Sequence, residues 1–181
     1  MKPGLRAALF IATFYIAAPA AAQHPDAGIQ TQLAEMKKLD FLVGQWRGNS
    51  WMQMGPNRST SQVFERIERR LDGMALVIEG LGKAKDAEGN ERVVHNALAM
   101  VNYDPAAKRY RFMSQTTQGY FTNAEARFED GAFIWGYKSP IGEFRFTIRL
   151  NEKGQWFEIG EVSRDSQPWQ KFFEMTLDRV Q

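Results

Sequence analysis

Turn signals recur at short intervals from residue 39 to the end of the chain, and they constrain the fold more than any other feature. They separate short runs of branched and aromatic residues, as at Asp72-Gly73, Asp104-Pro105 and Asp130-Gly131. Gly and Asn at such points supply the positive φ that tight hairpins need. No stretch beyond residue 39 has convincing helical periodicity. The pattern predicts an all-β fold, a single antiparallel up-and-down β-barrel of about ten strands.

Alternation of apolar and polar residues predicts which side of each strand faces the core. In 143–150 the even-numbered residues are apolar and the odd-numbered ones are polar, so the even set is expected inside. Hairpin turns at 130–131 and 139–142 then place Trp135 and Phe146 opposite each other on the inner face. Neighbouring hairpins therefore agree on one interior.

The loop at 151–154 decides the register of the strand that follows it. A plain four-residue loop would turn Phe157 and Ile159 inward. A turn with Gly154 in a left-handed bulge would instead turn inward every second residue from Trp156. The apolar residues of the last strand, Trp169, Phe173, Met175 and Leu177, pair better with the second register. We therefore expect the bulge.

The bulged register has a chemical consequence, because it turns Glu158 and Lys171 inward among aromatic residues on neighbouring strands. A charge inside a barrel must be paired, hydrated or bound to a ligand. Two interpretations stay open. In the first, Glu158 and Lys171 form an internal ion pair or lie near the open mouth of the barrel. In the second, they contact a ligand. On the strand after Gln118-Gly119, one face has small and partly polar side chains beside the bulky Trp135, namely Tyr120, Thr122, Ala124 and Ala126. Small residues inside a barrel leave room, so we expect a cavity there.

The first 22 residues have the features of a cleaved signal peptide. Lys2 and Arg6 precede an apolar run over 7–18, and Ala20-Ala21-Ala22 offers a small-residue cleavage site. The apolar run is shorter than the roughly 20 residues that a bilayer requires. We predict removal of 1–22, a polar segment with a short helix over 23–38, and a barrel domain over 39–181. The predicted location is periplasmic or secreted, without membrane insertion after cleavage.

Charge and cysteine content exclude several function classes. Without Lys2 and Arg6 the chain has 21 basic and 21 acidic residues, so a basic nucleic-acid-binding surface is unsupported. The absence of cysteine excludes disulfides, thiolate metal sites and a cysteine nucleophile. We predict no metal and no cofactor. The charged run at 65–70 is interpreted as a solvated strand face with cross-strand pairs.

A short motif connects the sequence to a known group of barrels. Phe41-Leu42-Val43-Gly44-Gln45-Trp46-Arg47-Gly48 resembles the opening of calycin barrels, where Gly-x-Trp begins the first strand. Lipocalins, fatty-acid-binding proteins and nitrobindin-like haem barrels share this opening. In lipocalins the tryptophan packs on an arginine of the closing strand, so the resemblance implies a structural role in barrel closure for Gly44, Trp46 and Arg179. The chain is most similar to an uncharacterised bacterial family of exported calycin-like domains of unknown function, which implies no established reaction.

Haem binding is not expected despite this resemblance. Nitrobindin-like barrels bind haem through a histidine near the end of the chain, whereas this sequence has only His24 and His95. His95 lies in the middle of a predicted strand and is interpreted as a hydrogen-bonded structural residue. No G-x-S-x-G or phosphate-binding motif supports another chemistry.

The predicted function is non-catalytic binding of a small, largely apolar molecule inside the barrel. The expected lining is Tyr120, Trp135, Tyr137 and Phe146, with Glu158 and Lys171 as polar anchors. A barrel of this size either fills with side chains or holds one ligand. Two alternatives stay open: an enzyme that uses buried Glu158 as a general acid or base, and a solid-core structural or protein-interaction barrel.

Overall fold

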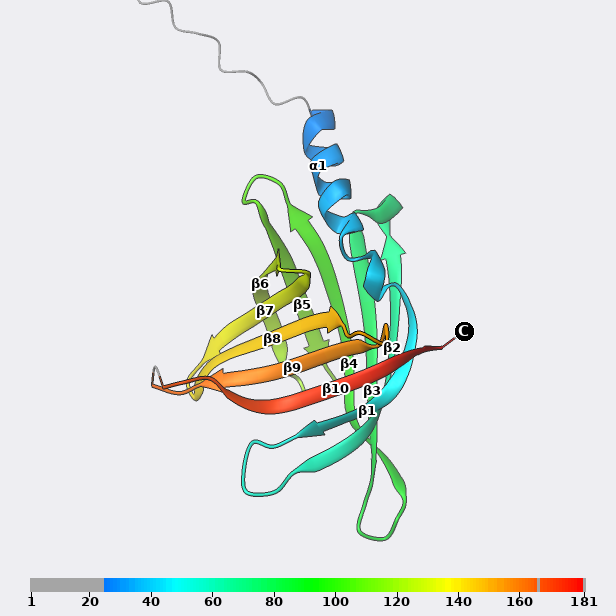
Figure 1. The fold of residues 1–181 in the computed structure, drawn as a ribbon, viewed down its shortest axis with the longest axis vertical. Coiled ribbons are helices and arrows are strands. Elements are labelled where there is room, and N and C mark those ends of the chain that lie inside the picture. The colour runs from blue at the N-terminus through cyan, green and yellow to red at the C-terminus, as the bar shows by residue number, and fades with distance from the viewer. Residues whose placement is uncertain (1–24, 166, 181) are drawn as a thin grey trace, which may run out of the picture.

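The computed structural model describes residues 25–165 and 167–180 of the 181-residue chain. The predicted signal segment lies outside these residues. The described chain forms one closed barrel of antiparallel strands, preceded by a single α-helix (Figure 1). The all-β barrel and the short helix before its first strand are therefore confirmed.

Helix α1 (Pro25–Lys37) and a 3-10 turn, η1 (Asp40–Leu42), lead into the barrel. The strands are β1 (Gly44–Met52), β2 (Ser59–Arg70), β3 (Ala75–Lys85), β4 (Glu91–Asp104), β5 (Arg109–Thr116), β6 (Phe121–Glu129), β7 (Ala132–Ser139), β8 (Gly142–Leu150), β9 (Trp156–Ser163) and β10 (Gln170–Val180). A second 3-10 turn, η2 (Leu71–Gly73), joins β2 to β3. Each strand pairs with the next, and β10 pairs with β1 to close the ring.

The barrel closes at the tryptophan of the Gly-x-Trp motif. Trp46 pairs with Arg179 across β1 and β10, and the Arg179 guanidinium carbon lies 4.1 Å from the centre of the Trp46 ring. The Arg179 Nη2 donates a hydrogen bond to the Phe41 carbonyl oxygen at 2.8 Å, and the Trp46 indole N–H donates to the Leu42 carbonyl oxygen at 2.7 Å. These contacts join both ends of the barrel sequence to the segment that enters it.

The predicted strand registers hold through most of the second half of the barrel. Trp135 pairs with Phe146, and Glu158 pairs with Ile148. Alternate residues of β9, beginning with Trp156, are buried, as the bulged loop predicts. The last strand differs, because its pairing with β9 shifts between Lys171 and Phe173. That irregularity changes which residues of β10 face inward before Phe173.

The two ends of the barrel are built differently. At one end α1, η1 and the residue that precedes η1 contribute the fully buried side chains of Met36, Leu42 and Leu39 to the core. The Tyr110 hydroxyl lies 2.9 Å from both the carbonyl oxygen and a carboxylate oxygen of Glu35, which fastens α1 to β5. We call this the capped end. At the other end, the open end, lie the turns β1–β2, β3–β4, β5–β6, β7–β8 and β9–β10.

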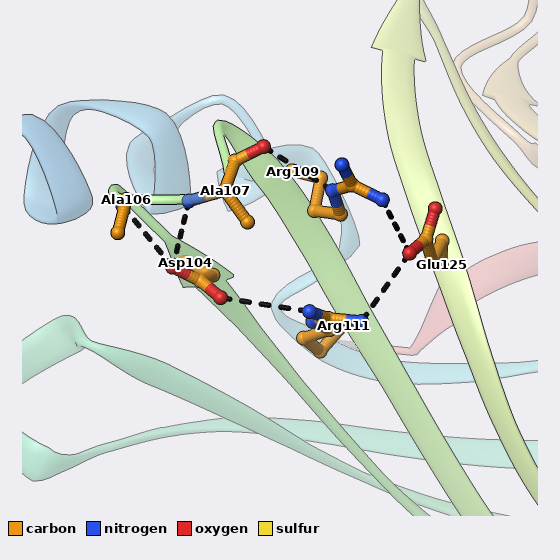
Figure 2. Close-up of polar contacts among 6 residues, drawn as sticks. All are labelled: Asp104, Ala106, Ala107, Arg109, Arg111 and Glu125. Carbon is orange, nitrogen blue, oxygen red and sulfur yellow. Dashed lines mark hydrogen bonds and ion pairs between the residues drawn. The ribbon is translucent and has the colours of Figure 1, made fainter.

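A charged network surrounds the β4–β5 turn on the outer wall (Figure 2). The Asp104 carboxylate accepts hydrogen bonds from the backbone N–H groups of Ala106 and Ala107 at 3.1 and 3.0 Å, which shapes the turn. Arg111 lies between Asp104 at 3.6 Å and Glu125 at 3.4 Å. The Ala107 hydrogen bond, followed by the Ala106 one and the Arg111 charge, holds the pKa of Asp104 below its usual value. Every charge here has a partner, so we assign the network a structural role.

Candidate functional site

The inner wall of the barrel changes character from the capped end to the open end. Near the cap, inward side chains such as Ile67, Leu76 and Phe133 are fully buried. Toward the open end, Trp135, Phe146 and Phe173 also face inward but are only half-buried. Inward side chains with accessible surface border space that the protein does not fill. The open half is therefore the candidate site.

Three aromatic rings form a flat stack on this wall. The Trp135 ring lies between Phe112, at 4.1 Å and 14°, and Phe146, at 4.2 Å and 10°. The indole N–H of Trp135 is buried and has no hydrogen-bond partner within the described chain. Buried donors in native proteins are rarely left unpaired. The stack thus combines a large apolar surface with one unsatisfied donor.

Tyr137 extends the aromatic wall toward the open end. Its ring stacks on Phe144 with centroids 5.0 Å apart and an interplanar angle of 12°, and Phe172 meets Phe144 edge-on at 5.4 Å. Burial raises the pKa of the Tyr137 hydroxyl, so this group stays protonated at neutral pH. The predicted residues Trp135, Tyr137 and Phe146 are therefore brought together on one face of β7 and β8.

Glu158 lies on the inner face of β9 and is 7% exposed. The Trp156 indole N–H donates a hydrogen bond to its Oε2 at 3.2 Å, and Trp156 packs edge-on against Trp46 with ring centroids 5.9 Å apart. Burial raises the pKa of Glu158 to about 8, because desolvation outweighs the Trp156 hydrogen bond. The carboxyl is therefore largely protonated at neutral pH when no ligand is bound.

A second interior carboxyl, Glu65 on β2, was not among the sequence predictions. A Cβ built on Gly80 would lie 2.8 and 2.9 Å from the two Glu65 carboxyl oxygens, so the glycine makes room for this group on the inner face. Burial raises the pKa of Glu65 well above its usual value, and the charge of Glu158 raises it further. The two acids thus lie close enough to influence each other's protonation.

The sequence did contain a signal for Glu65. Val63 and Ile67 are buried on the same strand, and Glu65 lies between them at the period of two that defines a strand face. The interpretation of 65–70 as a solvated face holds for Arg66, which pairs with Glu79 at 2.6 Å, but is wrong for Glu65. A mixed charge run concealed the alternation.

The expectation that Lys171 points inward beside Glu158 is wrong. Lys171 is exposed, its Nζ lies 2.6 Å from Glu174 Oε2, and it lies 5.6 Å from the Trp51 ring on the outer wall. The register shift between Lys171 and Phe173 brings the apolar Phe172 into the core instead. Phe172 is 5% exposed, and burying an aromatic ring is far more favourable than burying an ammonium group.

Tyr120 also does not line the interior. It lies in the turn before β6, is 72% exposed, and its backbone N–H donates to the Thr116 hydroxyl at 3.2 Å. The other residues expected on that strand face do turn inward, since they pair with inward-facing residues of β5. They are Thr122, Ala124 and Ala126. The turn ends one residue later than alternation alone implies, because β6 begins at Phe121.

The described part of the chain contains no group of three His, Asp or Glu side chains that could hold a metal ion. His95 lies on the inner face of β4 opposite Gly82, near the open end, and is exposed, although partial burial lowers its pKa. Its side chain makes no hydrogen bond within the described residues, so the interpretation as a hydrogen-bonded residue is not confirmed. His24 lies outside the described residues. Among the helices that the structure describes, none is both long and apolar enough to cross a membrane.

A wide groove of about 700 Å³ lies outside the barrel, on the outer wall of β1–β4. Most residues that line the groove face outward. Three lining residues face inward, and each lies between two outward-facing residues that also line the groove: Trp46, Glu65 and Gly80. Its outward-facing charged side chains have partners, since Arg66 pairs with Glu79 and Arg47 lies 4.9 Å from the Phe64 ring. We therefore place the candidate site inside the barrel and not in this groove.

Together, the fold and the site define a closed ten-strand antiparallel barrel with an aromatic interior and two inward-facing carboxyls. A similar solved structure is that of Rv2717c from M. tuberculosis, with a TM-score of 0.59 and 11% sequence identity, covering 81% of this chain and 98% of that one. At this identity the likeness concerns the fold alone. No family model matches the chain. No curated protein matches it either.

Proposed function

We propose that this protein is an exported, non-catalytic, calycin-like barrel that binds one small, largely apolar molecule in its interior. The observation that carries the proposal is the accessible surface of Trp135, Phe146 and Phe173, which face inward yet are only half-buried. A solid-core barrel would bury these rings completely. Stacked aromatic surfaces with few polar groups are typical of small-molecule sites.

The turns of the open end support entry of an apolar molecule there. Every one of these five turns, or the strand residues beside it, presents an exposed large apolar side chain. They are Met52 and Met54, Val93 and Val94, Tyr120 and Phe121, Ile141, and Trp169. Tyr120 thus belongs to the rim of the opening and not to the wall of the site. Contiguous exposed apolar residues commonly mark sites of interaction.

Haem is not part of this proposal. The resemblance to nitrobindin-like barrels would require a histidine in the closing strands, and β9 and β10 contain none. The signal-like segment over 1–22 supports export. The Gly-x-Trp opening and the Trp46–Arg179 contact support the calycin-like assignment.

A general acid or base is the second candidate function, favoured by a carboxyl that titrates at about pH 8 inside an aromatic site. Its test is an activity screen with the Glu158→Gln variant. Loss of a detected activity in a folded variant would favour the enzyme, and unchanged activity would exclude Glu158 as its acid or base.

The experiment for the binding proposal is titration with the neutral dye Nile red, joined to native mass spectrometry of the freshly purified protein. We expect saturable dye fluorescence that Ala97→Leu reduces at least tenfold, because Ala97 is inward-facing opposite Gly80 and Thr116. The matched control is Asn96→Leu, the adjacent outward-facing residue. No saturable binding, or equal loss in both variants, would overturn the proposal.

A further inference from the structure

The two interior carboxyls have fewer polar partners than ionised carboxylates require. Glu158 accepts one hydrogen bond, from Trp156, and no described residue donates one to Glu65. The only fully enclosed unpaired side-chain polar atoms of the described residues are Asn102 Oδ1 and Trp135 Nε1, so the free oxygens of both acids keep accessible surface.

Among the described residues, no Lys or Arg side chain forms an ion pair with either acid. Arg69 and Arg179 lie at the capped end, where Arg69 pairs with Asp40 and Arg179 donates to the Phe41 carbonyl oxygen. Lys171 lies on the outer wall with Glu174. Within 25–165 and 167–180, no Lys or Arg pairs with Glu65 or Glu158. If either carboxyl ionises inside the barrel, no described Lys or Arg side chain pairs with its negative charge.

An apolar aromatic surface borders the acids on both sides. Glu65 pairs across the strands with Trp46, whose ring meets that of Trp156 edge-on at 5.9 Å. Toward the open end, Phe146 pairs with Gly160, two residues from Glu158 on the same inner face. The unpartnered Trp135 N–H lies on this wall as a second unsatisfied group.

We propose that the interior site selects an organic cation, a small molecule with a flat apolar body and a protonated amine held between Glu65 and Glu158. This inference rests on the proposed binding function. An ammonium group supplies the donors and the positive charge that the two carboxyls lack. A carboxylate ligand would lose its hydration inside the barrel and meet two acids, with no Lys or Arg of the described residues to pair with it. The site therefore rejects fatty acids and other organic anions.

The test is calorimetric titration with three indoles of similar shape at pH 7: tryptamine, a cation; 3-methylindole, which is neutral; and indole-3-acetate, an anion. We expect tryptamine to bind at least tenfold more tightly than 3-methylindole, and the acetate not to bind. Glu65→Gln and Glu158→Gln should each reduce tryptamine affinity at least tenfold and leave 3-methylindole affinity within twofold. Using both variants keeps the test decisive if one fails to fold.

The matched control is Glu79→Gln. Glu79 lies on β3 next to Gly80, but its carboxylate is on the outer wall and pairs with Arg66. It should leave all three affinities unchanged. Equal or tighter binding of 3-methylindole or the acetate would overturn the cation inference and leave interior binding intact. Tryptamine affinity that falls equally in the Glu79 variant would also overturn it. Failure of all three indoles and of Nile red would overturn both proposals.

Discussion

The indole N–H of Trp156 donates to Glu158 Oε2 at 3.2 Å, and this is the one protein hydrogen bond that the structure shows for that buried carboxyl. One donor does not offset the desolvation of a charged group, so the pKa of Glu158 is raised to about 8. Glu158 therefore links the chemistry of the interior to the stability of the barrel.

Stability should fall as pH rises from about 4.5 to about 8. A carboxyl whose pKa is higher in the folded than in the unfolded protein contributes most below the unfolded value, and this contribution is lost as pH rises toward the folded value. We expect the wild-type free energy of unfolding to be lower at pH 8.5 than at pH 5.5 by a few kcal/mol. Urea denaturation at both pH values measures it.

Glu158→Gln should show a smaller loss over the same pH range, with Glu65 responsible for the remainder. Glu161→Gln is the control, since Glu161 lies on the outward face of β9 and pairs with Arg145 at 2.8 Å. If the free energy of unfolding of Glu158→Gln falls with pH as steeply as that of the wild type, the raised pKa of Glu158 is contradicted.

Arg179→Ala should lower the free energy of unfolding by about 1–3 kcal/mol, because it removes the stack on Trp46 and the hydrogen bond to the Phe41 carbonyl oxygen. Denaturant unfolding followed by tryptophan fluorescence reports both stability and the surroundings of Trp46. Arg149→Ala on the outer wall, 5.8 Å from the Phe157 ring, should change stability by less than about 0.5 kcal/mol. Equal effects of the two substitutions would show that closure does not depend on Arg179.

Tyr110→Phe should loosen the attachment of α1 and cost about 1–2 kcal/mol, since the Glu35 carbonyl oxygen and carboxylate lose their hydroxyl donor. Limited proteolysis should then cleave near residues 25–39 faster than in the wild type. Tyr103→Phe is matched, because Tyr103 is buried beside Tyr110 with ring centroids 5.0 Å apart and its hydroxyl makes no hydrogen bond within the described residues. Unchanged proteolysis of Tyr110→Phe would argue against this role.

Gly48→Ala should destabilise the barrel by about 2 kcal/mol or more, because a Cβ there would lie 2.0 Å from the Thr176 carbonyl oxygen on the neighbouring strand. Thermal melting by circular dichroism and soluble yield measure the effect. Gly55→Ala, in the β1–β2 turn with nothing within 4 Å of the built Cβ, is the control. If Gly48→Ala and Gly55→Ala have the same melting temperature, β1 and β10 separate more easily than this contact implies.

Most of the barrel could be predicted because its determinants are local. Turn residues set the strand boundaries, and alternation placed Trp135 opposite Phe146 and turned Glu158 inward. The errors arose where alternation was interrupted. Lys171 faces outward because β10 shifts register before Phe173, and Tyr120 lies in a turn where alternation extended the strand by one residue.

Glu65 shows the opposite difficulty. The pattern of its own strand was sufficient to predict that it faces inward, but the sequence did not indicate which side chains surround it. Whether a carboxyl between Val63 and Ile67 has a basic neighbour depends on strands distant in the sequence. Only the closed ring brings β2 and β9 near enough for Glu65 and Glu158 to affect each other.

The sequence by itself determined the succession of strands, their inner faces and the motif that closes the barrel, because turn chemistry and side-chain periodicity act between near neighbours in the chain. The tertiary structure decided which inward groups meet, which end is capped, and that two acids share an interior in which no described Lys or Arg pairs with them. Those relationships depend on strand register and on closure of the whole ring, which are set by packing across the barrel and not by any single segment.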